Sequence, residues 1–530
     1  MTHFSSELST GLIVKSNKIW RWQLNLIVVL VEAKLINVTA IIVQGSKPPL
    51  LPANIAYLHK LDSIVFRSPM KAYELVDLNI PDAGVFDSIE NDAGREVFSD
   101  IDLLINFSEV LVSSELKKVA KIGLLETHFS QQGSPESLSS VGFGFDEFAR
   151  GAKQCYFSVM GFTPNQMVYT LSESYPSLDS GSLSRNLNQY WALLESTWVS
   201  VCQRLQTQTL LQARYKSATE NKPLGIVDTP IYGGNAYKHL ASTFIDKLHQ
   251  KFFRKEQWVL LLQFQDQASN QIPLSFADYT EISPPDDCFW ADPFVISEKG
   301  RHFIFFEELP FVTERGHLSC MEVFDDGRHL APRVILKKPY HLSYPNVFKY
   351  ESEYYMIPES GDTGFVSLYR SAEFPYHWEY KHDLMSGLCA YDSTLIKHDG
   401  VWWLFACVAA KKGMSGCEEL HIFSADSPLS QSWAPHQLNP IISDASLARP
   451  AGKFFERDGV LYRPSQDCAG SYGAGLNINK VKMLTKDSYV EELVHCARPT
   501  WDNKLTALHT LNFNQHVSVA DAMRVDSRCF

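Results

Sequence analysis

The sequence predicts two domains, an N-terminal α/β domain with an open parallel sheet and a C-terminal all-β five-bladed propeller. The first observation is length, because 530 residues are too many for one ordinary hydrophobic core. The second is that strand and helix signals alternate up to about residue 130, whereas short strands and aromatic-rich turns follow from Trp258 onward. The third is a motif between Trp290 and Cys468 that recurs roughly every 50 residues, the period of a propeller blade.

The N-terminal part carries a βαβ pattern. The predicted strands are Gly11–Lys15, Val38–Val43, Asp100–Phe107 and Ile122–His128, and the predicted helix is Trp20–Glu32. Such a pattern implies a parallel sheet with right-handed crossovers, and ligands bind beyond the carboxyl ends of its strands. Asn106 and His128 stand at such ends. No GxGxxG or GxxxxGK[ST] motif follows the first strand, which disfavours dinucleotide and P-loop sites.

The boundaries follow from composition. Residues 184–211 keep a helical period and predict a bridging helix, so we assign residues 1–215 to the first domain. Residues 216–254 form the predicted linker, because the segment 223–236 is rich in glycine and proline. Residues 255–530 form the predicted propeller.

Each copy of the repeat has a polar or proline-containing entry, a short apolar run, a polar turn, and an aromatic-rich run ending in a polar residue. The copies are Trp290–Ile296 with Phe303–Glu308, Tyr344–Phe348 with Tyr354–Ser360, Tyr391–Ile396 with Val401–Ala406, and Arg449–Phe455 with Val460–Asp467. We assign Trp258–Phe264 and Leu508–Phe513 to a shared fifth blade, since joining the first and last strands removes exposed sheet edges.

Bulk properties exclude several classes. A net charge of −12 and a pI near 5.8 argue against broad binding to nucleic acid or an anionic membrane. Ten cysteines without CxxC spacing indicate reduced thiols in a cytoplasmic protein. Met1–Thr10 lacks signal-peptide features, and charges interrupt the apolar stretch 24–43, so we expect no stable membrane insertion. No histidine and cysteine cluster has zinc spacing, and we expect neither a metal nor a cofactor.

Radial symmetry would gather the polar ends of the repeats around one axis. Reaction at a sugar's anomeric carbon needs a carboxylic acid that protonates the leaving oxygen and a carboxylate that acts as base or nucleophile. We predict Glu359 as the acid, Asp292 as the base and Asp392 as an orienting group. These residue types at strand starts are also ordinary turn formers, which is the competing interpretation.

Further polar or aromatic residues at the same ends would hold the substrate. These predicted binding residues are Trp290, Asn346, Arg449, Gln466 and Asp467, with His128 as a separate candidate in the N-terminal domain. Arg449 could pair with a carboxylate or a phosphate. A lone histidine such as His128 is more often structural than catalytic.

The propeller half resembles the domain that precedes the transferase domain in plant glucosamine inositolphosphorylceramide transferases, a domain that also occurs in bacterial proteins. The resemblance lies in Ala291–Phe294, Tyr344–Phe348, Met356–Ser360, Asp392–Leu395, Trp402–Ala406, Arg449–Gly452 and Tyr462–Cys468. It implies a propeller of the glycoside hydrolase family 43 type. The plant transferase domain follows the propeller, whereas this sequence ends at Phe530, so we do not expect transferase activity to carry over directly.

The first 200 residues resemble a formyltransferase fold, through Asp100–Phe107 and the block Gly123–Ser130. Active members read Asn-x-His followed by Ser-Leu-Leu-Pro. Here His128 is kept, Glu126 replaces the asparagine, and the Ser-Leu-Leu-Pro segment is absent. A glutamate would repel the oxyanion of formyl transfer, so the resemblance implies a degenerate or repurposed domain.

Three functional hypotheses remain open. The leading one is a carbohydrate-active protein that acts on or transfers a glycosyl group of a sugar, nucleotide-sugar or glycolipid substrate in surface glycan biosynthesis. The second is a non-catalytic sugar-binding scaffold for a partner glycosyltransferase. The third is formyl or acyl transfer to an amino sugar at His128.

Overall fold

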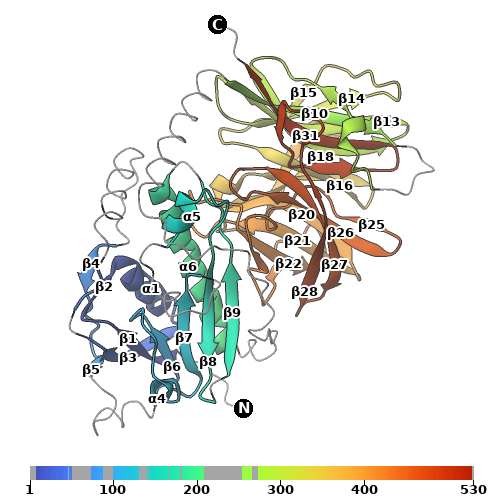
Figure 1. Cartoon of the computed structure of the whole chain (residues 1–530). Coiled ribbons are helices and arrows are strands. Elements are labelled where there is room, and N and C mark those ends of the chain that lie inside the picture. Colours follow the sequence, from blue (N-terminus) through green and yellow to red (C-terminus); the bar gives the residue numbers. More distant parts are fainter. Residues whose placement is uncertain are drawn as a thin grey trace. The chain divides into compact units, whose positions relative to one another are not determined.

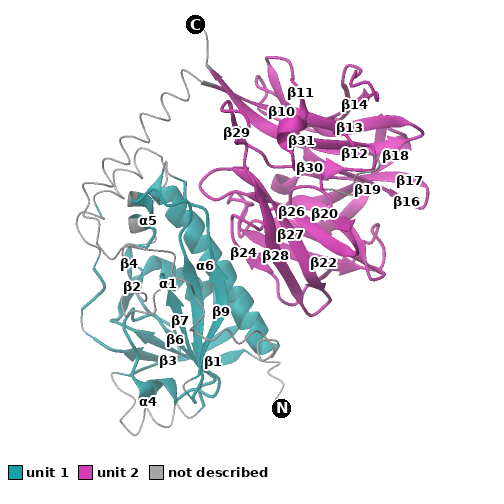
Figure 2. Cartoon of the chain, turned by 45° about the vertical axis from the view of Figure 1, so that its right-hand side comes forward, with its two compact units in different colours: residues 1–243 teal, residues 244–530 magenta. Residues whose placement is uncertain are grey.

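The chain forms two compact units, residues 1–243 and 244–530 (Figures 1 and 2). A computed structural model describes residues 7–45, 47–50, 56, 73–86, 100–130, 140, 143–165, 167–179, 182–207, 254–265 and 272–527. Of the predicted linker, residues 216–254, only Arg254 is among the described residues. The domain boundaries predicted from sequence are therefore not tested and stay predictions. Among the described residues, no helix combines the length and apolar character needed to cross a bilayer.

The first unit is built on a seven-stranded mixed sheet. Its order is β5 (Gly84–Phe86), β3 (Ile36–Val43), β1 (Leu8–Val14), β6 (Leu103–Asn106), β7 (Gly123–His128), β8 (Phe157–Phe162) and β9 (Val168–Ser174). A separate two-stranded sheet pairs β2 (Lys18–Trp20) with β4 (Leu75–Asp77). The four strands predicted from sequence are present as β1, β3, β6 and β7.

The prediction of a wholly parallel sheet is wrong at one edge. Strands β5, β3, β1, β6 and β7 run parallel, but β8 pairs antiparallel with β7, and β9 with β8. The hairpin from β8 to β9 turns where the backbone N–H of Thr163 donates to the Met167 carbonyl at 3.0 Å. Such a hairpin needs no crossover helix, which is why strand and helix alternation does not reveal it.

Two long helices of this unit pack through aromatic side chains. They are α1 (Arg21–Glu32) and α6 (Leu183–Gln206), with the short helices α4 (Ser114–Lys117) and α5 (Phe145–Ala149) elsewhere in the unit. Ser182 caps α6 by accepting the Arg185 N–H at 3.3 Å. Trp22 of α1 stacks on Trp191 of α6 with ring centroids 4.6 Å apart. The predicted helices are therefore confirmed.

The second unit consists of five antiparallel sheets, which we number as blades 1 to 5. Blade 1 holds β12 (Cys288–Glu298), β13 (Arg301–Pro310), β14 (His317–Val323) and β15 (Arg333–Leu336). Blade 2 holds β16 (Ser343–Tyr350), β17 (Glu353–Glu359), β18 (Phe365–Glu373) and β19 (His377–Ser386). Blade 3 holds β20 (Ala390–His398), β21 (Val401–Val408), β22 (Glu419–Ala425), β23 (Ala434–Pro435) and β24 (Ile442–Ser443). Blade 4 holds β25 (Phe455–Arg457), β26 (Val460–Asp467), β27 (Gly475–Leu484) and β28 (Tyr489–Ala497). Single 3₁₀ turns lie at Phe276–Asp278 and Gly361–Thr363.

Blade 5 joins the two ends of the unit. It holds β10 (Arg254–Phe264), β11 (Thr280–Ile282), β29 (Leu505–Ala507), β30 (Leu511–Phe513) and β31 (Val517–Ser527). β10 pairs with β31 along its whole length, from Arg254 opposite Ser527 to Phe264 opposite Val517. The predicted shared fifth blade is confirmed, although the strand paired directly with β10 is β31 rather than the predicted run that contains β30.

The hydrophobic core shows that the ring of blades is closed. Five buried clusters each span a pair of neighbouring blades: 1 with 2, 2 with 3, 3 with 4, 4 with 5, and 5 with 1. Phe294 and Tyr344, for example, contact edge to face across the first of these junctions at 4.8 Å. Because each blade buries apolar side chains against both neighbours, the five sheets form one propeller, as predicted.

The innermost strands of blades 1, 2 and 3 share a bulge. Pairing with the next strand is interrupted at Asp292–Pro293, Tyr344–Pro345 and Asp392–Ser393. Asp292, Tyr344 and Asp392 have φ values of 53°, 43° and 52°, a left-handed conformation that non-glycine residues seldom adopt. Bulges of this kind redirect side chains and are frequent beside active sites. The repeat therefore aims one polar side chain per blade at the axis.

Gly452 offers a test of this inner ring. It has a φ of 122°, and a Cβ there would lie 2.0 Å from the Leu511 carbonyl oxygen of blade 5. We expect Gly452→Ala to lower the midpoint of the propeller's thermal transition by about 5–10 °C, since strain and a backbone clash add up to a few kcal/mol. Gly459→Ala is the control, because φ is 71° there but nothing lies within 4 Å. Equal shifts for both variants in scanning calorimetry would contradict this account.

Candidate functional site

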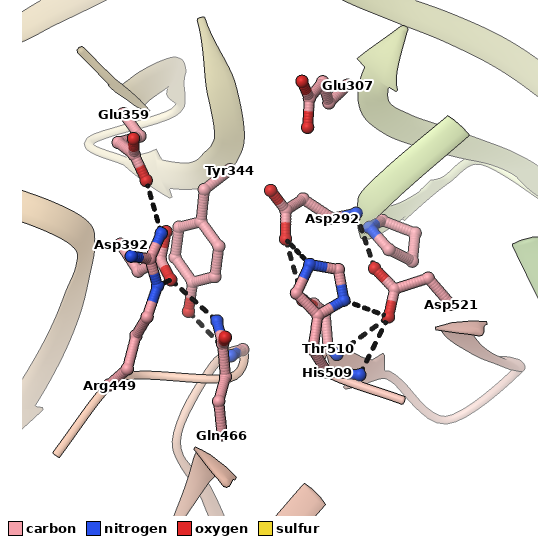
Figure 3. Close-up of polar contacts among 12 residues, drawn as sticks. Asp292, Glu307, Tyr344, Glu359, Asp392, Arg449, Gln466, His509, Thr510 and Asp521 are labelled. Atoms are coloured by element: carbon pink, nitrogen blue, oxygen red, sulfur yellow. Dashed lines mark hydrogen bonds and ion pairs between the residues drawn. The ribbon is translucent and has the colours of Figure 1, made fainter. Parts of the chain in front are cut away.

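Acidic side chains from separate blades converge at the propeller axis. Asp292 comes from blade 1, Glu359 from blade 2 and Asp392 from blade 3, and all three are buried. Figure 3 shows them in one cluster, with Arg449 on the side of Glu359 and Asp392. The sequence-predicted carboxylates thus share one site rather than lying on different faces of the molecule.

Arg449 ties two of the carboxylates together. Its Nε donates to Asp392 Oδ2 at 2.6 Å, and its Nη2 to Asp392 Oδ1 at 3.3 Å and Glu359 Oε2 at 3.0 Å. Gln466 Nε2 adds a hydrogen bond to Asp392 Oδ2 at 2.8 Å. The rings of Tyr391 and Tyr472, both partly exposed, lie 5.3 and 5.1 Å from the guanidinium carbon. This pairing compensates the buried charge of Asp392.

Asp292 belongs to a second chain of contacts, formed with blade 5. Its Oδ1 accepts the Thr510 hydroxyl at 2.9 Å and lies 3.3 Å from His509 Nε2. His509 Nδ1 donates to Asp521 Oδ1 at 2.7 Å, so Asp521 fixes the orientation of the ring. Burial disfavours the imidazolium, but Asp521 and Asp292 outweigh it and raise the pKa of His509. The result is a buried Asp–His–Asp chain.

Asp292, His509 and Asp521 have ligand atoms within 4.8 Å of one another, a spacing that suits a metal ion. Their hydrogen bonds limit this possibility. Asp521 Oδ1 accepts the backbone N–H groups of His509 and Thr510 as well as the ring, and Oδ2 accepts the Asp292 N–H at 2.7 Å. Within the trio, His509 Nε2 and the Asp292 carboxylate could ligate a cation without losing an N–H hydrogen bond. Ligation by Asp521 would break one of the N–H hydrogen bonds that it accepts. We therefore interpret the trio as a positioning chain for Asp292.

The carboxyl groups differ in their pKa values. Burial raises the pKa of Asp292 to about 6, with His509 opposing the shift and the charges of Asp392 and Asp521 adding to it. Burial, followed by repulsion from Asp392, raises the pKa of Glu359 well above its usual range despite Arg449. The two carboxyl groups thus differ in their partners and in the causes of their shifts, and carboxyl groups in unlike environments are the pairing that general acid and base chemistry requires.

Tyr344 lies between Asp392 and Asp292 (Figure 3). Its side chain is fully buried, and its hydroxyl contacts Thr394 Oγ1 at 2.8 Å and accepts the Gly452 N–H at 2.6 Å. It therefore links blades 2, 3 and 4 at one point. These contacts fix the blades that carry Glu359 and Asp392 relative to one another.

The other predicted binding residues have structural contacts. Asn346 Nδ2 donates to the Ser393 carbonyl at 3.0 Å, and Trp290 packs against Phe306 in the cluster between blades 5 and 1. Asp467 is bound by Arg498. His128 lies in the other unit, 3.4 Å from Glu126 Oε2. Of the predicted set, the axis therefore gathers Asp292, Glu359, Asp392, Arg449 and Gln466.

Sequence reasoning missed four site residues: Glu307, His509, Thr510 and Asp521. Glu307 follows an aromatic run in the first repeat as Glu359 follows one in the second, so alignment of the copies would have found it. Asp521 lies in a run of small and apolar residues on β31. No local signal identifies it, because its role comes from the pairing of blade 5 with blade 1.

Residues 269–515 match the family described as glucosamine inositolphosphorylceramide transferase 1, N-terminal. This confirms the resemblance expected for the propeller. Proteins named glucosamine inositolphosphorylceramide transferase 1 from Oryza sativa subsp. japonica and Arabidopsis thaliana are 40% and 34% identical to the chain over 221 residues. The aligned part covers 41% of this chain and 29% and 28% of those proteins. The chain thus spans less than a third of the length of the curated relatives it matches.

Solved structures with similar architecture include sugar-cleaving enzymes. The family 117 glycoside hydrolase Zg3597 of Zobellia galactanivorans is 12% identical, with 51% of this chain and 90% of that chain covered and a TM-score of 0.33. The catalytic domain of the Coprinopsis cinerea GH62 α-L-arabinofuranosidase is 13% identical, with 47% and 96% covered and a TM-score of 0.34. Likenesses at these TM-scores carry no functional inference.

Arg449→Met would remove the cation while keeping much of the side-chain volume. We expect a loss of about 3–5 kcal/mol in propeller stability at pH 8, because the variant leaves Asp392 and Glu359 buried without their cation. The loss should be smaller at pH 5, because the pKa of Glu359 is raised and protonation then removes its charge, whereas the stability of the variant falls as pH rises through that pKa. Thermal unfolding at both pH values measures this.

The control is Arg328→Met, which removes an exposed partner of the exposed Asp326. We expect little change at either pH. A destabilisation by Arg449→Met that does not depend on pH would show that packing, rather than charge pairing, is the role of Arg449.

Proposed function

We propose that the propeller binds a sugar at its axis and acts in glycosyl transfer or glycan biosynthesis. The observation that carries this proposal is the convergence of Asp292, Glu359 and Asp392 from three blades onto one buried cluster. The similarity of residues 269–515 to the transferase-associated family supports it. The substrate would be a sugar, a nucleotide sugar or a glycolipid, as the names of the plant relatives suggest.

The roles follow from the protonation states. Glu359, whose pKa is raised well above its usual range by burial and by Asp392, would donate its proton to the leaving oxygen. Asp292, ionised above about pH 6, would act as base or nucleophile with His509 holding it in place. Asp392, paired with Arg449, would supply a fixed negative charge that keeps the pKa of Glu359 high. This assignment keeps the acid and the base on different blades.

Glu359→Gln tests the enzymatic form of the proposal. We expect turnover of a nucleotide sugar or aryl glycoside to fall by about 10²–10⁴-fold, because the amide N–H is not acidic enough to protonate the leaving oxygen. Sugar binding, measured by saturation-transfer NMR on the full chain, should change little. Glu373→Gln, at a largely exposed position, is the matched control.

Other outcomes separate the alternatives. Sugar binding by the wild-type chain without turnover of any donor would favour the second hypothesis, a non-catalytic scaffold for a partner glycosyltransferase. Binding that survives Asp292→Asn, Glu359→Gln and Asp392→Asn unchanged would show that the axis is not the sugar site.

The formyltransferase-like assignment of the N-terminal unit, and the cytoplasmic location, stay predictions. One observation favours a ligand site in that unit: Asn106 Nδ2 donates to Glu126 Oε1 at 3.0 Å, and His128 lies beside Glu126 at the carboxyl ends of β6 and β7. Glu126 is buried, and its charge opposes an oxyanion.

If this unit still uses a formyl donor, the chain should bind a folate analogue. His128→Ala should weaken that binding by at least about tenfold, because the variant loses one charge-assisted hydrogen bond. Isothermal titration with a non-hydrolysable formyltetrahydrofolate analogue measures the affinity. His382→Ala, in the propeller, is the control. Absence of binding by the wild-type chain would end the formyl-transfer hypothesis.

A further inference from the structure

A serine, a histidine and an aspartate form a hydrogen-bonded chain at one end of blade 1. Ser297 Oγ lies 2.7 Å from His302 Nδ1, and His302 Nε2 lies 2.8 Å from Asp325 Oδ1. Ser297 and His302 face each other across the hairpin of β12 and β13, and Asp325 follows β14. Ser297 is five positions beyond Asp292 on β12, roughly 16 Å along the strand. The three residues therefore lie apart from the acids at the axis.

The hydrogen bonds define the direction of this chain. Asn514 Oδ1 accepts two backbone N–H groups of the turn that follows it, so its Nδ2 is the atom that donates to Ser297 Oγ at 2.9 Å. A carboxylate oxygen only accepts, so His302 Nε2 carries the proton that bonds to Asp325. In the neutral ring Nδ1 is then an acceptor, and the Ser297 hydroxyl donates to it. The serine proton is thus directed at a base that an acid holds in place.

These contacts are the ones that activate a serine as a nucleophile. The histidine takes the hydroxyl proton, while the carboxylate keeps the ring in one tautomer and stabilises the cation that forms. In the familiar serine hydrolases Nε2 faces the serine, whereas here Nδ1 does, and the two nitrogens divide the same two tasks. His302 is buried and Ser297 is partly exposed, so the base is held in place and the nucleophile is accessible.

An open cavity of about 440 Å³ gives a substrate access to Ser297. Besides the three residues of the chain, it is lined by Phe264, Gln265, Lys299, Gly300 and His516. Lys299 and His516 offer N–H groups for the negative charge that develops on a carbonyl oxygen during attack. The mostly polar lining and the modest volume suit a short acyl group rather than a long apolar chain.

We propose that Ser297 is the nucleophile of a second active site, which cleaves esters of short carboxylic acids with His302 as the base and Asp325 as the residue that positions the base. This inference goes beyond the sugar site at the axis and does not depend on it, because the two sites share no residue.

The reaction has two balanced halves. Ser297 Oγ bonds to the carbonyl carbon of the ester as its proton moves to His302 Nδ1. The bond between that carbon and the alcohol oxygen then breaks, and the Nδ1 proton passes to the departing oxygen. Water attacks the acyl-serine in the same way, and the proton that it gives to Nδ1 returns to Ser297 Oγ as the acid leaves. Each cycle consumes one ester and one water and releases one alcohol and one acid.

Hydrolysis of p-nitrophenyl acetate by the full chain tests turnover. We expect Ser297→Ala to lower kcat/KM by at least about 100-fold, because the variant has no hydroxyl to form the acyl intermediate. Ser371→Ala is the matched control and should leave the rate unchanged. Ser371 is also partly exposed and near a histidine, but its hydroxyl donates to the His377 carbonyl at 3.3 Å rather than to a ring nitrogen.

A fluorophosphonate probe identifies the nucleophile directly, because an activated serine displaces fluoride from phosphorus far faster than an ordinary hydroxyl does. Peptide mass spectrometry of the labelled chain should locate the adduct on Ser297. Asp325→Asn should slow labelling and lower kcat by at least about tenfold with KM nearly unchanged, since the amide can donate to His302 Nε2 and favour the wrong tautomer. Asp326→Asn is the control, because the exposed Asp326 pairs with Arg328 instead.

Three results would overturn the proposal. The first is ester hydrolysis that Ser297→Ala does not reduce, since other groups on the surface would then account for it. The second is a wild-type chain without an adduct on Ser297. The third is labelling of Asp325→Asn at the wild-type rate. The last two need no change in the core, because the wild-type chain is intact and the Asp325 side chain is largely exposed, so they decide even if Ser297→Ala does not fold.

Discussion

The pairing of β10 with β31 is the constraint on which the propeller and its site depend. It joins strands that are more than 250 positions apart in sequence, from Arg254 opposite Ser527 to Phe264 opposite Val517. Without it, blades 1 and 4 would each expose an apolar face that the clusters with blade 5 now bury. The closing blade also carries His509, Thr510 and Asp521, which hold Asp292. The pairing that closes the ring therefore also assembles the site.

The site itself is a compromise between burial and charge. Five acids are held out of water, and burial raises the pKa values of Asp292, Glu307 and Glu359. One arginine forms direct ion pairs with Asp392 and Glu359 and so lowers the cost of burying them. Asp292 is held differently, by a histidine whose own charge depends on Asp521. Because Asp292 and Glu359 have different partners, their pKa values are raised to different extents. Glu307 has a histidine beside it instead, with His341 Nε2 3.2 Å from its Oε1.

The repeat explains why so much could be predicted. The four sequence copies map onto the two inner strands of blades 1 to 4, and the polar residue at each entry occupies a bulge with left-handed φ in three of them. Asp292, Glu359, Asp392, Arg449 and Gln466 were found in this way. The same pattern also predicted Trp290 and Asn346 as binding residues. Trp290 packs between blades 5 and 1, and Asn346 donates a hydrogen bond to the Ser393 carbonyl of blade 3. A position in the repeat predicts nearness to the axis, not the direction of the side chain.

The sequence alone determined the α/β and all-β halves, the number of blades and the acids at their mouths, because periodicity and repeats are local properties of a chain. It could not determine that β8 and β9 turn the N-terminal sheet antiparallel at one edge, since a hairpin leaves no crossover to detect. Only the tertiary structure decided that Asp521 and His509 orient Asp292, and that His341 lies beside Glu307. Such roles are set by distances between distant segments, and pKa values follow from those distances and from burial.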